Sequence, residues 1–125
     1  MLNGNGKAAY DPQGEVKEAQ YHFVWPNATI NIEAGRPNLS IDTWIPDGPD
    51  SAIGVTDHFF APDVPVELQD EMMAFARQVG AEDDALVESV HRGLSSGMVE
   101  KGRLLLPSEN LIAHFQRLVL EAVSG

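Results

Sequence analysis

Two different spacings of apolar residues divide the chain into a strand-rich part and a helical part. Between Tyr21 and Phe60 apolar and polar residues mostly alternate, which is typical of strands that bury one face. From Leu68 onward the apolar residues recur every three or four positions, which is the spacing of one helix face. Strands followed by helices predict the α+β fold class, with an antiparallel sheet meander first and helices after it.

Turn residues in the first part predict three strands. The first strand covers Tyr21 to Ile32, and Pro26 within it is interpreted as a bulge or a sheet edge, because proline cannot donate to the ladder. Reversals are expected at 34–37, Ala-Gly-Arg-Pro, and at 46–50, Pro-Asp-Gly-Pro-Asp. The alternation between and after these turns predicts the second strand over 39–45 and the third over 53–60.

Three helices are predicted in the second part. The first ends at Gly80, which is placed as a C-terminal stop, and the second runs from about Glu82 to Ser96. The third opens at Pro107-Ser108-Glu109. Each outer helix carries an apolar stripe, formed in the first by Leu68, Met72, Phe75 and Val79, and in the third by Leu111, Phe115, Leu118 and Ala122.

Composition places these elements in one modest domain. The chain has 125 residues, 43% of them hydrophobic, which allows a single core but not two full-sized domains. Residues 1–19 are Gly-rich and polar, so they are expected to form a flexible leader before a domain that covers 20–125. The absence of cysteine excludes disulfides and cysteine-ligated metal sites within these 125 residues.

Charge and hydropathy narrow the expected partners. With 8 basic and 19 acidic residues, the net charge of −11 repels phosphate backbones and anionic membranes, so no nucleic-acid and no membrane partner is expected. No apolar run reaches the roughly 20 residues of a membrane span, and residues 1–6 lack a signal-peptide core. These observations favour a soluble, cytoplasmic protein.

One carboxylate falls on a helix face that is otherwise apolar. A projection of about 100° per residue places Asp83 on the stripe formed by its aliphatic neighbours. An ionised carboxylate in a core costs several kcal/mol, by order of magnitude, unless it has a partner. Asp83 is therefore interpreted as a helix cap, as the partner of a buried Arg or His, or as a metal ligand. Its apolar neighbours on this stripe are Leu86, Val87, Val90 and Leu94.

A second possible metal motif lies on the adjacent face of the same helix. Glu88 and His91 have the Glu-x-x-His spacing of carboxylate-bridged di-iron bundles, and Asp84 lies beside them. The other predicted helices supply no matching pair, so a solvated helix face is the favoured interpretation. The remaining histidines, which form no His-x-His or His-x-x-x-His pair, are His22, His58 and His114.

Four segments taken in order resemble one protein family. They are YHFVWPNATINI from Tyr21 to Ile32, IPDGPDSAIGV, QVGAEDDALVESVHRGLSSG and GRLLLPSENLIAHFQRLV. Together the chain from about residue 20 to 120 resembles the C-terminal part of the catalytic domain of a Rieske-type aromatic ring-hydroxylating oxygenase α subunit. The aromatic-Pro-Asn strand, the Gly-Pro-Asp turn and the acidic helix carry this resemblance.

The resemblance implies a helix-grip (START/Bet v 1-like) domain that holds a mononuclear Fe(II) by two His and one carboxylate. The carboxylate position corresponds to Asp83, with Asp84 as the fallback if the register is shifted by one. The sheet of such domains forms part of the pocket wall, and Glu88 with Arg92 is expected to form a helix-surface ion pair or an interdomain contact. The residues expected to line the substrate pocket are Trp25, Asn27, Thr29 and Asn31.

The family's paired iron-ligating histidines and its Cys/His-bound 2Fe-2S cluster have no counterpart in these 125 residues. The expected partners are therefore upstream Rieske and catalytic regions, a ferredoxin or reductase, and further copies of the chain. The resemblance implies hydroxylation of an aromatic or related organic substrate with O₂ and NAD(P)H-derived electrons. No catalytic residue is assigned here, and the chain alone is expected to be inactive. The alternative is a small α+β module that binds an apolar ligand without metal.

Overall fold

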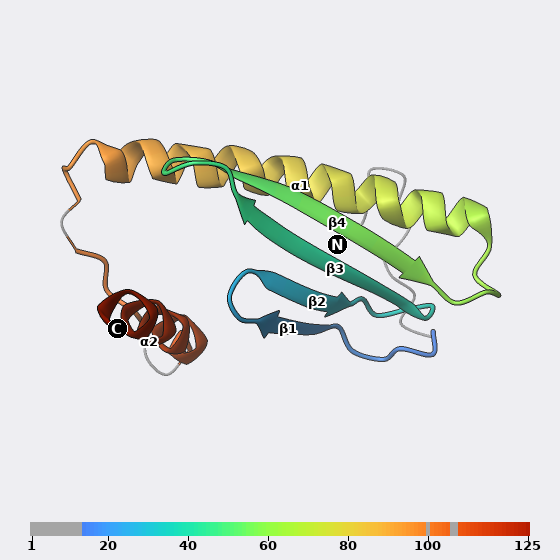
Figure 1. The fold of residues 1–125 in the computed structure, drawn as a ribbon. Coiled ribbons are helices and arrows are strands. Elements are labelled where there is room, and N and C mark those ends of the chain that lie inside the picture. The colour runs from blue at the N-terminus through green and yellow to red at the C-terminus, as the bar shows by residue number, and fades with distance from the viewer. Residues whose placement is uncertain (1–13, 100, 106–107) are drawn as a thin grey trace. The chain divides into compact units, whose positions relative to one another are not determined.

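The computed structural model describes residues 14–99, 101–105 and 108–125. It forms two compact units, Met1–Glu82 and Asp83–Gly125. The element order is four strands followed by two helices (Figure 1), which confirms the predicted α+β class. No described helix is both long enough and apolar enough to span a membrane.

The sheet consists of β1 (Gln20–Val24), β2 (Ala28–Ile32), β3 (Asn38–Pro46) and β4 (Ala52–Phe60). Each strand pairs antiparallel with the next, in the order β1-β2-β3-β4. The expected first strand is therefore wrong in one respect, because it is a hairpin of two strands. Pro26, interpreted as a bulge or a sheet edge, lies in the turn of this hairpin after a cis Trp25-Pro26 peptide bond. The strand alternation on both sides of the turn concealed the reversal.

Strand register gives the sheet two chemically different faces. Directly paired residues of antiparallel strands lie on the same face. One face carries the row Phe23, Thr29, Asp42 and Thr56, and beside it the row Tyr21, Asn31, Ser40 and His58. We call this the polar face. The opposite, aliphatic face carries Ile30, Ile32, Leu39, Ile41, Ile45, Ile53, Val55 and Phe59.

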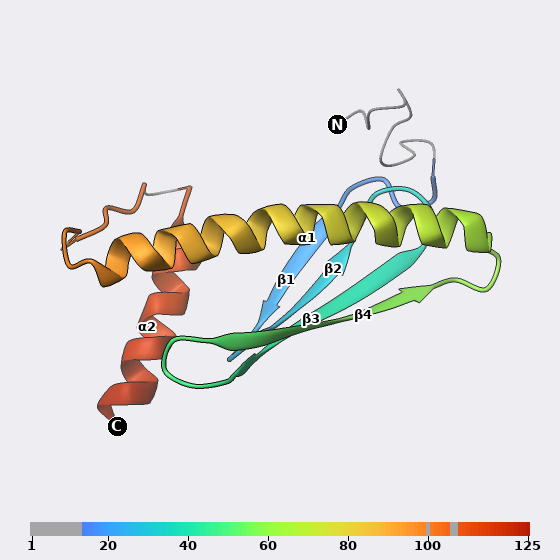
Figure 2. The same cartoon turned by 90° about the horizontal axis from the view of Figure 1, so that it is seen from above.

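The longest helix, α1 (Val66–Ser95), is one element of 30 residues and not the two helices that were predicted. It continues through Gly80 as a single helix (Figure 2). A glycine inside a helix costs only about 1 kcal/mol relative to alanine, and the residues around it are good helix formers. The helix ends instead before Gly97, whose φ of 73° is the left-handed conformation common after a helix C-terminus.

The last helix, α2 (Asn110–Ser124), begins close to the predicted position. Glu109 precedes it without a side-chain cap hydrogen bond, and the Ser108 hydroxyl donates to the Leu105 carbonyl at 2.7 Å. Pro107, which was expected to open this helix, lies outside the described residues.

The described end of the expected leader is joined to the connection between β2 and β3. Residues 1–13 lie outside the described part, but Val16 and Gly35 exchange two backbone hydrogen bonds of 3.0 and 2.9 Å. Gly14 is buried there, and a Cβ built on it would lie 2.2 Å from the Gly35 carbonyl oxygen. The backbone approach at this point therefore requires glycine.

Most apolar side chains remain accessible to solvent. Among the described residues the only buried hydrophobic one is Val64, with 3% of its surface exposed. On the aliphatic face Ile53 is 52% exposed, and on α1 Val87 is 66% exposed. Such contiguous apolar surfaces in proteins mark sites of contact with another surface.

The continuity of α1 gives a first prediction. A Cβ at Gly80 would meet no atom within 4 Å, so Gly80→Ala is expected to stabilise the helix by about 0.5–1 kcal/mol. Gly97→Ala should have the opposite sign, because its positive φ is unfavourable for alanine. Circular dichroism during thermal unfolding measures both variants. A loss of helicity in Gly80→Ala would contradict the continuous helix.

The aliphatic face gives a second prediction, which is that the chain self-associates. Ile45 and Ile53 are directly paired on β3 and β4, so replacing both by threonine removes apolar surface while keeping a residue that favours strands. Light scattering is expected to give a lower mass for this variant. The double valine variant, which keeps the face apolar, should associate like the unmodified chain. A monomer at high concentration for the unmodified chain would overturn the prediction.

Candidate functional site

Asp83, the predicted metal ligand, lies in α1 at the start of the second compact unit. Its predicted burial is wrong for this chain, because Asp83 is exposed. The apolar stripe that it shares is exposed as well, with Leu86 at 63% and Val90 at 52%. The helix projection identified the stripe correctly, but within its own unit this stripe is not packed against other residues.

The described residues do not complete an iron site. No group of three His, Asp or Glu side chains among them is arranged to hold a metal ion. The Asp83 carboxylate is accessible and has the oxygen donor chemistry of a single ligand. Glu88 Oε2 lies 3.7 Å from Arg92 Nη1, which agrees with the expected helix-surface ion pair.

The four predicted lining residues divide between the hairpin turn and the sheet. Thr29 and Asn31 are half-buried on the polar face of β2. Asn27 lies in the turn, where its Nδ2 donates to the Trp44 carbonyl at 2.7 Å and so connects the turn to β3. Trp25 also lies in the turn and is 40% exposed. The structure thus places only the β2 pair on one common face.

A carboxylate that the sequence analysis did not select lies at the centre of the polar face. Asp42 Oδ2 accepts hydrogen bonds from Asn31 Nδ2 at 2.6 Å and from Thr29 Oγ1 at 3.2 Å. Asp42 Oδ1 accepts one from Thr56 Oγ1 at 2.6 Å. One carboxylate therefore connects three neighbouring strands. The available signal was the alternation itself, which puts a polar residue on this face in β2, β3 and β4.

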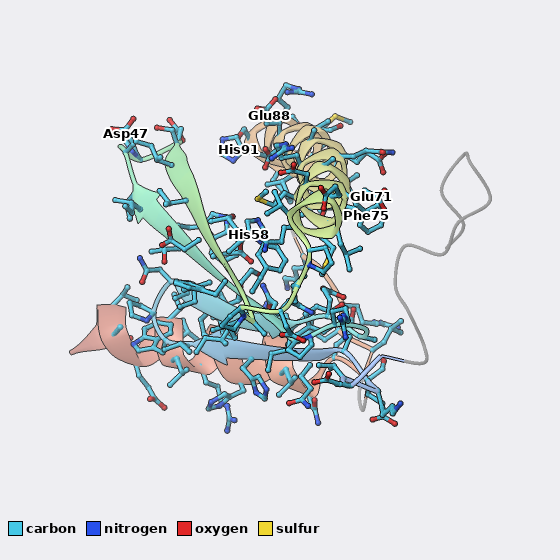
Figure 3. The ribbon with its side chains drawn as sticks, turned by 90° about the vertical axis from the view of Figure 1, so that its right-hand side faces the viewer. Asp47, His58, Glu71, Phe75, Glu88 and His91 are labelled. Atoms are coloured by element: carbon cyan, nitrogen blue, oxygen red, sulfur yellow. The ribbon has the colours of Figure 1, made fainter. Side chains whose placement is uncertain are left out.

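Aromatic side chains flank this cluster on the same face. Trp44 follows Asp42 by two positions, and its indole lies over Gly54 of β4, where a Cβ would come 3.7 Å from the indole Nε1. Further along β4, His58 stacks on Phe60 with ring centroids 6.4 Å apart. His58 projects into the space between the sheet and the first part of α1 (Figure 3), so the polar face is the one turned toward this helix.

Tyr21 at the margin of the polar face donates its hydroxyl to Glu33, at 3.1 and 3.2 Å from the two carboxylate oxygens. Burial raises the pKa of Tyr21, and the charge and hydrogen bond of Glu33 raise it further. The arrangement therefore favours the protonated phenol, which donates to Glu33.

Comparisons with known proteins agree on one family. The sequence profile of the ring hydroxylating alpha subunit (catalytic domain) matches residues 3–125. Chloroplastic choline monooxygenase of Arabidopsis thaliana is 35% identical over 120 residues, which cover 91% of this chain and 26% of that protein. The chain thus spans about a quarter of the length of this relative. No solved structure matches it.

The Tyr21 contact predicts a pH effect. Glu33→Gln should lower the pKa of Tyr21, because it removes the carboxylate charge beside the phenol. The preference for the protonated phenol stabilises the fold fully below pH 10.0 and is lost as the pH rises through the raised pKa. Phenolate absorbance in a Tyr10→Phe background measures Tyr21 alone. An unchanged or higher pKa in Glu33→Gln would contradict the assigned contact.

Proposed function

Because this chain belongs to the ring-hydroxylating oxygenase α-subunit family, we propose that it forms the C-terminal part of the catalytic domain of a Rieske non-haem iron oxygenase. The observation that carries the proposal is the family match over residues 3–125. The order of elements supports it, since an antiparallel sheet precedes a long helix that bears the acidic pair. A helix-grip arrangement of the complete domain is part of the proposal.

Asp83 is proposed as the single iron ligand that this chain supplies. A mononuclear iron held by two His and one carboxylate keeps open positions at which O₂ is activated beside the substrate. The two histidines and the 2Fe-2S cluster would come from regions upstream of this segment. The exposed stripe around Asp83 supports this role, because an accessible carboxylate among apolar neighbours suits a surface that another part of the protein covers.

The reaction partners follow from the same proposal. The complete oxygenase would hydroxylate an aromatic or related organic substrate, with electrons that pass from NAD(P)H through a ferredoxin or reductase. It would work as a homo-oligomer in the cytoplasm. Thr29 and Asn31 would line the substrate pocket from the sheet, and the turn residues Trp25 and Asn27 would form its margin.

The assigned ligand is tested by producing the chain together with the upstream part of the catalytic domain and measuring bound Fe(II). Asp83→Ala is expected to lower the iron content at least about tenfold, since loss of a ligand removes a metal bond. Asp84→Ala is the matched control and should keep the iron, because it removes the same side chain one position along α1.

The outcomes separate three assignments. Iron lost only in Asp84→Ala would move the ligand by one position. Equal iron in the unmodified protein and both variants would overturn the carboxylate assignment. Iron lost only in Glu88→Gln would favour the Glu-x-x-His site instead.

A further inference from the structure

We propose that the polar face of the sheet binds a quaternary ammonium group, with the Asp42 carboxylate as its counter-charge. This inference rests on the proposed function and deepens it, since it narrows the proposed aromatic or related organic substrates to those that carry a quaternary ammonium group. It starts from a charge that the described protein leaves uncompensated. The ion pairs among the described residues join Arg36 to Glu15 and Asp63, and Arg92 to Glu88.

The sequence around Asp42 supplies almost no cation. Between residues 18 and 76 the only lysine or arginine is Arg36, and it is used in the pairs with Glu15 and Asp63. Arg77, which follows in α1, is exposed and makes no described ion pair with Asp42. His58 is the nearest titratable group on this face, two residues beyond Thr56 along β4. It lies opposite Ser40 of β3 in the strand register, and its ring stacks on Phe60. Asp42 is therefore a half-buried carboxylate that has no oppositely charged partner among the described residues.

The hydrogen bonds of Asp42 indicate which kind of cation fits. A carboxylate has about four acceptor positions, and Asn31, Thr29 and Thr56 already occupy three of them. About one acceptor position is left for a ligand, whereas the charge has no partner among the described residues. A primary ammonium brings three N–H donors, each of which needs an acceptor. A fully methylated ammonium brings charge without donors, and so it matches this carboxylate better.

The aromatic neighbours favour the same ligand. Two aromatic residues share the polar face with Asp42. Trp44 lies two positions further along β3, and Phe23 lies on β1, two strands away in the same row. Aromatic faces attract cations within about 6 Å of the ring, and tryptophan does so most strongly. The Trp44 indole lies over Gly54, so this ring is beside β4. Carboxylate and aromatic surface on one side of a sheet are the two elements from which quaternary ammonium sites are made.

The overall charge agrees with a cationic ligand. The net charge of −11 attracts cations and repels carboxylate or phosphate compounds. A neutral aromatic substrate over Asp42 would strip water from an unpaired carboxylate, and this desolvation is costly. A cation with apolar methyl groups avoids that cost because it brings the missing charge into the pocket.

The test uses the 125-residue chain in the presence of a metal chelator, with choline as the probe and amide chemical shifts as the readout. Choline is expected to bind in a saturable way and to shift the amides around Asp42. Its neutral carbon isostere, in which a quaternary carbon replaces the nitrogen, should bind at least about tenfold more weakly. Ethanolamine, which has a primary ammonium, should also bind more weakly than choline.

The variants assign the effect to one carboxylate. Asp42→Asn is expected to weaken choline binding about tenfold. Asp57→Asn is the matched control, since it removes the same charge from the opposite face of β4 and should bind choline normally. Combining Asp42→Asn with Asn31→Asp moves the carboxylate to the neighbouring strand and should restore part of the binding. The amide spectrum of each variant verifies that the sheet has formed.

Three results would overturn a cationic ligand at Asp42. These are the absence of saturable choline binding, equal binding of choline and its neutral isostere, and unchanged choline binding by a folded Asp42→Asn variant. Ethanolamine binding more tightly than choline would overturn the quaternary class. Because iron is chelated throughout, the result is independent of Asp83. Failure at Asp42 and failure of the proposed iron ligand are therefore distinguished.

Discussion

Strand register is the constraint on which the rest of the structure depends. Every pairing from β1 to β4 places directly opposed residues on the same face, so a slip of one residue would exchange the polar and the aliphatic faces. The bonds from Asn31, Thr29 and Thr56 to Asp42 form only in the observed register. The same carboxylate thus serves the fold, by connecting three strands, and the proposed ligand site, by its charge.

The fold was largely predictable because its signals are periodic. Alternation identified the sheet, the switch at Leu68 identified the helices, and both gave the α+β class. The errors fell at single residues that have more than one structural use. Pro26 is equally compatible with a bulge and a turn, and Gly80 is tolerated inside a helix whose neighbours propagate it. Local propensity does not decide such cases. The pairing of β1 with β2 decides the role of Pro26, and the helix formers on both sides decide that of Gly80.

The candidate site was less predictable than the fold. Asp83 was found because a carboxylate interrupts an apolar stripe, but its exposure depends on what packs against α1, and one helix's sequence does not encode that. Thr29 and Asn31 were selected through the family resemblance. The structure shows that both donate hydrogen bonds to Asp42. Asp42 was missed because a polar residue at an alternating strand position looks like an ordinary solvent-facing one. Only the register brings three donors to it.

The scarcity of buried apolar surface has a calorimetric consequence. Heat capacity changes on unfolding in proportion to the apolar area that becomes hydrated, and here Val64 is the only buried hydrophobic residue among those described. Unfolding of the chain by itself should therefore show a small heat-capacity change. Its free energy of unfolding should also depend only weakly on urea concentration. Most of that signal would appear instead when the aliphatic face and the α1 stripe are covered, so assembly rather than folding would dominate the thermodynamics of this protein.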